Sequence, residues 1–207
     1  MEKQGVSSKT VYRLSQYSRC LSRLLEKGSE TVSSSIIAAA AGVKPSQLRK
    51  DLSVVGQIGT RGLGYPVETL YHAIREVLGR EQLQPVVLVG AGNLGRALLR
   101  YEGFKKEGFE VVAAFDASEE VCSRAGLPCP IYQDAEMCDF VRDNNVQMAI
   151  LCVPGEYGQD VANKLINAGV SGILNFSPVV LKVPEEIMVN NVDLAMELEN
   201  LSFFVAK

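Results

Sequence analysis

The feature that most constrains the fold is a glycine turn, Gly90-Ala91-Gly92-Asn93-Leu94-Gly95, which directly follows the apolar segment 86–89. The turn fits the pattern G-x-G-x-x-G, and Asp116 follows 21 residues after Gly95, at the end of the next predicted strand. In such a turn the first glycine permits a tight bend, the second lets the backbone approach a pyrophosphate, and the third lets helix and strand pack closely. The sequence therefore predicts a strand, a nucleotide-binding turn and a helix in succession.

From residue 85 onward, strands and helices are expected to alternate. Strands are predicted at 86–89, 110–115, 131–132, 146–152 and 172–176, with helices near 93–104, 135–144 and 159–168. The strands are apolar at consecutive positions, as expected when helices cover both faces of a parallel sheet. This part is predicted to be a Rossmann-like doubly wound parallel sheet of the α/β class. A last helix, 192–205, has Leu194, Leu198, Leu201 and Val205 on one stripe.

The expected ligand is a dinucleotide held at the carboxyl ends of the strands. All six residues of the turn are candidates for phosphate contact, because the helix that follows presents unpaired N–H groups. Asp116 would bind the ribose hydroxyls and repel a 2′-phosphate, which favours NAD(H) over NADP(H). A similar fold also binds coenzyme A, and the sequence leaves that ligand open.

The loops after the fourth and fifth strands should line the same crevice. Val153, Pro154 and Phe176 are expected to form an apolar nicotinamide pocket that disfavours the cationic ring of NAD⁺, since burying an unpaired charge is costly. Tyr101, on the helix after the turn, is the polar aromatic residue expected nearest the cofactor. A dehydrogenase would need an acid or base beside the nicotinamide. We find no convincing one, so an enzyme is disfavoured.

Histidine and cysteine usage also argues against an enzyme or a metal protein. The only histidine is His72, which lies before the predicted linker, so a site with several histidine ligands is impossible. The five cysteines are scattered without a C-x-x-C pair, so neither a zinc site nor a disulfide framework is expected. No apolar run approaches the roughly 18 residues of a membrane helix, and the polar N-terminus lacks a signal-peptide core. A cytoplasmic protein without metal or membrane partner is predicted.

Charge separates the chain into two halves. Residues 1–80 carry 12 basic and 6 acidic residues, a net charge of +6, whereas the remainder carries 9 basic and 18 acidic residues, a net charge of −9. The polar stretch 79–84 is the best linker candidate. A basic unit joined to an acidic one suggests two domains with different partners, and the basic one is a candidate for binding nucleic acid.

The basic half has the pattern of a helix-turn-helix domain. Helices are predicted at 10–27, 33–41, 44–55 and 67–78, with Ser33 or Ser34 as an N-cap and Gly42 in the tight turn. A glycine-rich hairpin is predicted over 56–65. On the third helix Leu48, Leu52 and Val55 share one face. The opposite face carries Ser46, Arg49, Lys50 and Ser53, side chains suited to a DNA major groove, and Arg61 on the hairpin could enter a minor groove.

Several of these segments resemble the Rex redox-sensing transcriptional repressors of bacteria. They are 47–53, 59–65, the glycine turn, 172–178 and 191–193, and the similarity covers essentially the whole chain. The resemblance implies a winged helix-turn-helix domain at 1–80, a Rossmann-like NAD(H)-binding domain at 81–190, and a dimerisation helix at 191–207 that is exchanged in a homodimer. It adds Gln47 and Tyr65 to the DNA-contact set, and it implies a palindromic operator that is released when NADH binds.

The linkage between the two domains is a further expectation. Arg19 and Asp193 are candidates for an ion pair made in only one state, from their positions and from the family resemblance. The alternative interpretation of the whole chain is an NAD-dependent oxidoreductase, or a coenzyme A-binding protein, with an accessory DNA-binding domain. An acid or base beside the nicotinamide would discriminate the enzyme from the repressor.

Overall fold

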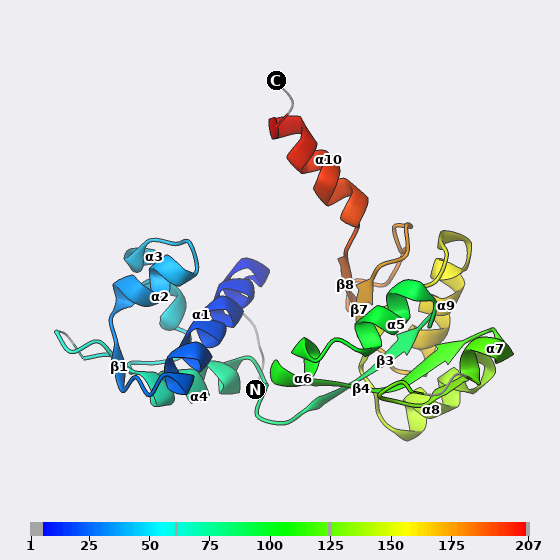
Figure 1. Cartoon of the computed structure of the whole chain (residues 1–207), viewed down its shortest axis with the longest axis horizontal. Helices are drawn as coiled ribbons and strands as arrows, with labels where there is room; N and C mark the ends of the chain where they lie inside the picture. The colour runs from blue at the N-terminus through cyan, green and yellow to red at the C-terminus, as the bar shows by residue number, and fades with distance from the viewer. Residues whose placement is uncertain (1–5, 61, 124–125, 206–207) are drawn as a thin grey trace. The chain divides into compact units, whose positions relative to one another are not determined.

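The computed structural model describes residues 6–60, 62–123 and 126–205. The chain divides into two compact units, an N-terminal unit, Met1–Gln82, and a C-terminal unit, Leu83–Lys207. The break falls inside the polar stretch 79–84 that the sequence suggests as a linker. None of the helices in the described parts of the chain combines the length and the apolar character needed to cross a bilayer. Figure 1 shows the helices and strands of both units.

The N-terminal unit is a small helical domain. Its elements are α1 (Ser8–Glu26), β1 (Thr31–Val32), α2 (Ser34–Ala40), α3 (Pro45–Leu52), β2 (Tyr65–Pro66) and α4 (Val67–Val77). Ser33 caps α2 by accepting the N–H of Ile36, and Pro45 occupies the first turn of α3. Gly42, between them, has a φ of +65°, which a side chain would disfavour. The four helices and the helix-turn-helix predicted from the sequence are confirmed.

The hairpin predicted over 56–65 is wrong in its pairing. The antiparallel pair is instead β1 with β2, which matches Val32 with Tyr65. Within 56–65 the described residues form a loop closed by a single bridge between Thr60 and Gly64. Three of its glycines have positive φ, so too few consecutive residues are extended to make two strands. Arg61 lies outside the described residues.

The C-terminal unit is a six-stranded parallel sheet in the order β5-β4-β3-β6-β7-β8. The strands are β3 (Gln84–Val89), β4 (Phe109–Asp116), β5 (Ile131–Gln133), β6 (Met148–Leu151), β7 (Gly172–Asn175) and β8 (Met188–Asn191). The helices are α5 (Asn93–Leu99), α6 (Gly103–Lys106), α7 (Glu119–Cys122), η1 (Asp134–Glu136), α8 (Met137–Asp143), α9 (Gly155–Ala168) and α10 (Leu194–Val205). Counted within the unit, the strand order is 3-2-1-4-5-6, that of the Rossmann fold, and it confirms the predicted sheet.

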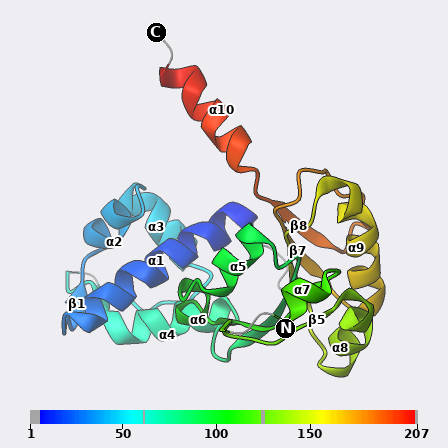
Figure 2. The same cartoon turned by 45° about the vertical axis from the view of Figure 1, so that its right-hand side comes forward.

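Helices cover both faces of this sheet, as Figure 2 shows. Val87 and Val89 point to one face and pack with residues of α8 and α9. Val86 and Leu88 point to the other face and pack with Leu99 of α5 and with Phe104 of α6. Because neighbouring residues of β3 are buried on opposite faces, the strand is apolar without alternation.

Three elements depart from the sequence prediction. The helix expected at 93–104 ends at Leu99, and α6 begins at Gly103, where an added Cβ would lie 2.3 Å from the Tyr101 ring. The short helix α7 and the edge strand β8 were not predicted. β8 contributes two asparagines, which are poor strand formers, and it has a single neighbouring strand, so its sequence lacks a strand signal. Every residue of α10 is exposed.

Candidate functional site

The glycine turn joins β3 to α5 with three different constraints. Gly90 has a φ of +94°, and an added Cβ would lie 2.5 Å from the Cys152 carbonyl oxygen. A Cβ on Gly95 would lie 2.0 Å from the Gly90 carbonyl oxygen. A Cβ on Gly92 would meet no atom within 4 Å. Two glycines are thus required by packing, and the third leaves open space above the backbone at the start of α5, which fits a phosphate group.

Asp116 at the end of β4 is held against this turn. Its Oδ2 accepts the N–H of Ala91 at 2.8 Å, and its Oδ1 accepts the N–H of Ser118 at 2.9 Å. A carboxylate offers about four acceptor positions, so each oxygen retains capacity for another donor. The residue predicted to bind a ribose is therefore fixed beside the residues predicted to bind phosphates. Asn93 and Leu94, the first residues of α5, are exposed at the same place.

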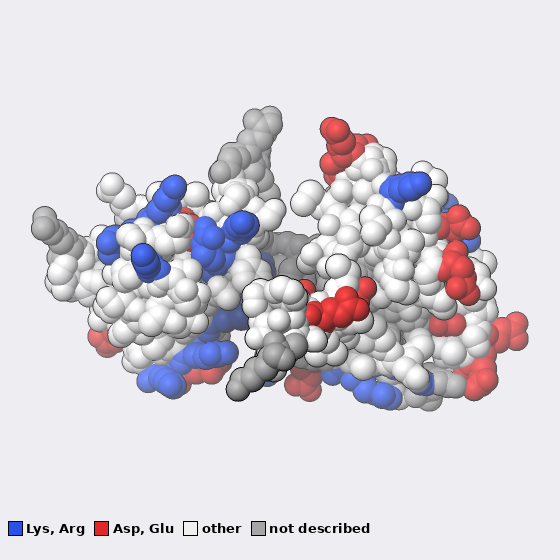
Figure 3. Space-filling view, turned by 90° about the horizontal axis from the view of Figure 1, so that it is seen from above, with Lys and Arg blue, Asp and Glu red and all other residues white. Residues whose placement is uncertain are grey.

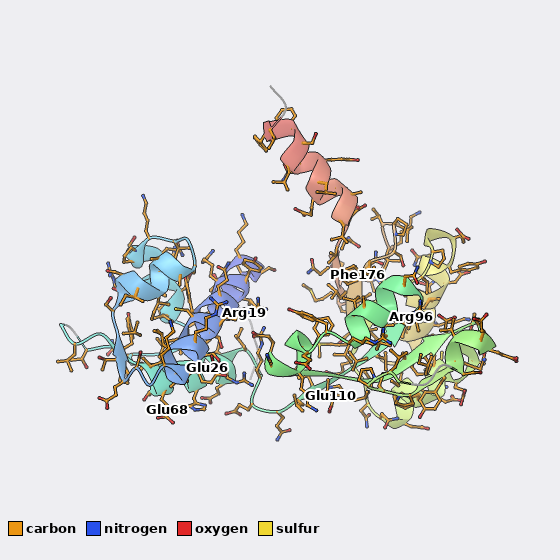
Figure 4. All side chains as sticks on the ribbon, viewed as in Figure 1. Arg19, Glu26, Glu68, Arg96, Glu110 and Phe176 are labelled. Atoms are coloured by element: carbon orange, nitrogen blue, oxygen red, sulfur yellow. The ribbon has the colours of Figure 1, made fainter. Side chains whose placement is uncertain are left out.

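A second part of this region lies at the carboxyl ends of β7 and β8. A pocket of about 460 Å³ brings Leu94 and Phe176 together with residues 191–196. Figure 4 shows Phe176 at the end of β7. The buried Asn175 shapes the pocket, because its Nδ2 donates to the Val179 carbonyl and to Asn191 Oδ1, at 2.9 and 2.8 Å. Sequence reasoning missed the contribution of 191–196 to this pocket, because it missed β8.

Val153 and Pro154 do not line the pocket that Phe176 lines. Val153 lies behind the glycine turn, where its Cγ1 would be 3.0 Å from a Cβ on Gly90. Its carbonyl accepts a hydrogen bond from Ser177 Oγ at 2.7 Å, which ties the loop after β6 to the loop after β7. Pro154 is the N-cap residue of α9. The two residues therefore support the sheet edge that carries the turn.

Tyr101 is not brought to the glycine turn. It follows the C-terminal end of α5, opposite the end where the turn lies, and its ring packs edge-to-face on Phe104. It lines a cavity of about 890 Å³ with Phe109 and Leu127. The sequence expectation assumed one helix from 93 to 104, and the break after Leu99 redirects this side chain. Lys105 lies four residues after Tyr101, a spacing that sequence reasoning overlooked, and its Nζ contacts Glu110 Oε1 at 3.1 Å.

The exposed face of α3 in the N-terminal unit is the second candidate site. Leu48 and Leu52 are buried, whereas Ser46, Arg49, Lys50 and Ser53 are exposed, as the helical spacing predicts. Arg49, Ser53 and Tyr65 line a groove of about 770 Å³ between α2, α3 and the loop 56–65. The Gln47 side chain is instead directed toward the buried Asp51, because its Nε2 donates to Asp51 Oδ1 at 2.8 Å. Figure 3 shows several Lys and Arg side chains on one face of the N-terminal unit.

Asp51 forms a buried polar cluster that sequence reasoning missed. It accepts hydrogen bonds from Arg13 and Tyr17 of α1 and from Gln47 of α3. The Arg13 guanidinium holds the pKa of this carboxyl below its usual range, and burial raises the pKa of the Tyr17 hydroxyl. Two of these partners, Tyr17 and Arg13, are 34 and 38 residues away in sequence, so no local pattern could have found them.

In the part of the chain that the structure describes, His72 and the cysteines are poor candidates for a nucleophile or a metal site. His72 is exposed on α4 and packs edge-to-face against Tyr71. The five cysteines are free and half-buried, and desolvation raises the pKa of Cys152 to about 12, so its thiolate is scarce at neutral pH. No cluster of three or more possible metal ligands occurs among residues 6–60, 62–123 and 126–205.

Two family models match the two units. One, described as "Putative DNA-binding protein N-terminus", matches residues 5–53, and the other, described as "CoA binding domain", matches residues 81–179. Curated relatives of nearly the same length are called redox-sensing transcriptional repressor Rex. The relative from Carboxydothermus hydrogenoformans is 44% identical, over 96% of this chain and 95% of the relative. The relative from Streptomyces coelicolor is also 44% identical, over 97% of this chain and 78% of the relative.

Crystal structures of RSP, a Rex-family repressor, are similar to the whole chain at 33% identity. The complex of RSP with beta-NAD⁺ and operator DNA has a TM-score of 0.89 and covers 98% of this chain and 93% of RSP. The complex of RSP with beta-NADH has a TM-score of 0.84 and covers 97% and 94%. These comparisons confirm the predicted fold class. They also confirm the prediction that the chain is a transcriptional repressor and not an enzyme. The chain belongs to the Rex family of redox-sensing transcriptional repressors.

Proposed function

We propose that this chain binds a palindromic DNA operator as a homodimer and that NADH, held in the C-terminal unit, releases it. The observation that carries the proposal is the open backbone at Gly92 beside the fixed carboxylate of Asp116. The same chain carries a helix, α3, that exposes Arg49 and Lys50. The relative RSP was crystallised with beta-NADH and with beta-NAD⁺ and operator DNA, which supports both ligands. A repressor of this kind must have access to both DNA and NADH in one compartment, which supports a cytoplasmic location.

The dinucleotide is proposed to lie along the carboxyl edge of the sheet. Its pyrophosphate would sit over Gly92 and the first N–H groups of α5, and its adenosine ribose would donate to Asp116. Its nicotinamide would enter the pocket lined by Leu94 and Phe176. Bound NADH supplies no chemistry here and acts as a regulatory ligand. The match to the model called "CoA binding domain" makes coenzyme A the competing ligand to exclude.

The Asp116→Ala variant should bind NADH about tenfold to a hundredfold more weakly, because a charge-assisted hydrogen bond to a ribose hydroxyl is worth about 1.5–3 kcal/mol. The variant should also lose discrimination against NADPH, since the carboxylate that repels a 2′-phosphate is gone. Fluorescence titration with both dinucleotides measures each effect. Glu119→Ala, an exposed acidic change at the start of α7, is the control and should leave NADH affinity unaltered. Wild-type NADH affinity in Asp116→Ala would show that Asp116 does not bind the ribose.

The DNA-contact set proposed for the N-terminal unit is Ser46, Gln47, Arg49, Lys50, Ser53, Arg61 and Tyr65. The Lys50→Ala variant should weaken operator binding by about 1–3 kcal/mol if Lys50 contacts a base. If it contacts only a phosphate, binding to every duplex should weaken alike and the salt slope should fall by about 1. Lys27→Ala, at the exposed C-cap of α1, is the matched control. Unaltered affinity for every duplex in Lys50→Ala would remove Lys50 from the DNA-contact set.

The operator itself can be found without knowing the regulated genes. Duplexes selected by the full-length protein from a random-sequence pool should contain a palindrome, because a two-fold dimer presents two copies of α3. Selection of a palindrome that competes strongly over scrambled DNA supports the proposal. A pool that stays random, with only salt-sensitive binding, would overturn it.

Domain coupling is proposed to use Arg19 of α1 and Asp193. Asp193 Oδ1 accepts the N–H groups of Ala195 and Met196, at 2.9 and 3.1 Å, so it also caps α10. Asp193→Asn should keep the cap, since Asn and Asp cap equally well, but it removes the charge. We expect both Asp193→Ala and Asp193→Asn to shift the NADH concentration that releases DNA. A shift in Asp193→Ala alone would assign the residue to capping, and no shift in either would exclude the coupling.

A further inference from the structure

The buried carboxylate of Asp51 joins α3 to α1 through a fully used set of hydrogen bonds. Arg13 donates from Nε at 2.6 Å and from Nη2 at 2.7 Å, and the Tyr17 hydroxyl donates at 2.8 Å. Gln47 Nε2 completes the set at 2.8 Å. The Asp51 side chain is only 2% exposed, so these four donors replace its water. We call Arg13, Tyr17, Gln47 and Asp51 the Asp51 cluster.

The geometry of these bonds fixes α3 more narrowly than apolar packing alone could. Leu48 and Leu52 pack against the same core, but such contacts have no preferred direction. A two-pronged arginine–carboxylate pair is planar and directional, so it resists both sliding and rotation of one helix on the other. The Arg13 guanidinium also lowers the pKa of Asp51, so the pair stays charged at neutral pH.

The placement of Asp51 makes this restraint relevant to the exposed face. Asp51 directly follows Arg49 and Lys50 on an eight-residue helix whose opposite side is buried. A small rotation of such a short helix displaces the tips of these long side chains, and hydrogen bonds to base edges tolerate little displacement. Contacts with phosphates are less demanding, because they depend mainly on charge.

We propose that the Asp51 cluster sets the orientation of α3, and that Arg13 and Tyr17 thereby act as positioning residues for sequence-specific DNA binding. The inference rests on the proposed operator binding. It assigns to α1 a share in operator selectivity without any contact between these two side chains and a base. A purely structural role would instead support the fold of the unit and leave selectivity alone.

Two full-length variants test the proposal without changing net charge. Tyr17→Phe deletes one hydroxyl of the Asp51 cluster, and Tyr71→Phe, which deletes a hydroxyl on α4 of the same unit, is its control. The double variant Arg13→Met/Asp51→Leu replaces the ion pair by apolar side chains, an exchange that often leaves stability unaltered or raised. Fluorescence anisotropy measures binding to the palindrome selected by the unaltered protein and to a scrambled duplex, at one salt concentration. Thermal unfolding is followed in parallel.

We expect the ratio of specific to non-specific affinity to fall by about tenfold or more in the double variant, an effect comparable to that of a mismatched base pair in the site. In Tyr17→Phe the ratio should fall by a smaller factor. Scrambled-duplex binding should change by less than about twofold, because the net charge is unchanged and the exposed basic residues Arg49 and Lys50 remain. A wild-type ratio in a folded double variant overturns the proposal. If the double variant is unfolded, a wild-type ratio in Tyr17→Phe overturns it. Failure to select any palindrome would instead overturn the proposed operator binding.

Discussion

A Gly92→Ala variant is expected to keep the stability of the unaltered protein and to lose at least about tenfold in NADH affinity, or about 1.4 kcal/mol. The added methyl group meets no protein atom within 4 Å. The backbone at Gly92 has φ −67° and ψ −156°, so it lies outside the positive-φ region that favours glycine over residues with a side chain. The methyl group would nevertheless occupy the open space over the start of α5, where the pyrophosphate is proposed to lie. The effect should therefore appear in ligand binding and not in folding.

Gly95→Ala provides the contrast within the same turn. Its Cβ would lie 2.0 Å from the Gly90 carbonyl oxygen, and backbone cannot move aside as a flexible side chain can. Overpacking of this kind costs about 1–3 kcal/mol or more, so the thermal midpoint should fall. Calorimetric titration with NADH and thermal unfolding of both variants separate the two roles. Wild-type NADH affinity in Gly92→Ala would show that the dinucleotide does not approach the turn.

The second large effect is expected from α10. Leu198 and Leu201 are 67% and 60% exposed, and Leu194, Phe203 and Phe204 of the same helix are exposed as well. A helix of 12 residues with so much apolar surface is not stable in water by itself, so we propose that a second copy of the chain covers it. Leu198→Glu/Leu201→Glu should place two charges in that interface and produce a monomer. The affinity for a palindromic duplex should then fall by about a hundredfold or more, because one subunit engages only one half-site.

Light scattering gives the mass of the species, and anisotropy gives its DNA affinity. Asn200→Glu adds a charge to the same helix without deleting an apolar side chain, and it is the control for charge and helix propensity. The control should remain dimeric and bind the palindrome. A double variant that stays dimeric would show that α10 lies outside the subunit interface. A monomer with unaltered operator affinity would show that the two half-sites are not read together.

The parts of the fold that the sequence predicts well are those with strong local signals. The glycine turn and Asp116 identify the first strands, and the spacing of Leu48 and Leu52 orients α3. The boundaries 1–80, 81–190 and 191–207 remain part of the proposal, and the break between the two compact units, after Gln82, lies close to the first of them. The strand β8 gave no signal, because its asparagines are more typical of turns than of strands.

The parts of the site that escaped prediction depend on contacts between distant segments. In the Asp51 cluster, Tyr17 and Arg13 precede Asp51 by 34 and 38 positions in the sequence. The capping role of Asp193 depends on where α10 begins. Tyr101 is displaced from its expected place because the helix breaks before Gly103, a break that the periodicity alone did not reveal. Spacing along one helix was sufficient for the exposed face of α3, but not for the groove that α2 and the loop 56–65 form with it.

The most direct test of the account is the affinity of the full-length protein for its selected palindrome at saturating NADH, NAD⁺, NADPH and coenzyme A, each in turn. The account predicts that NADH lowers DNA affinity by about tenfold or more, a differential affinity for two states of about 1.4 kcal/mol. NAD⁺ should leave the complex intact, and NADPH and coenzyme A should act only at much higher concentrations. Equal DNA affinity at saturating NADH and NAD⁺ would contradict a redox-sensing repressor controlled through the C-terminal unit.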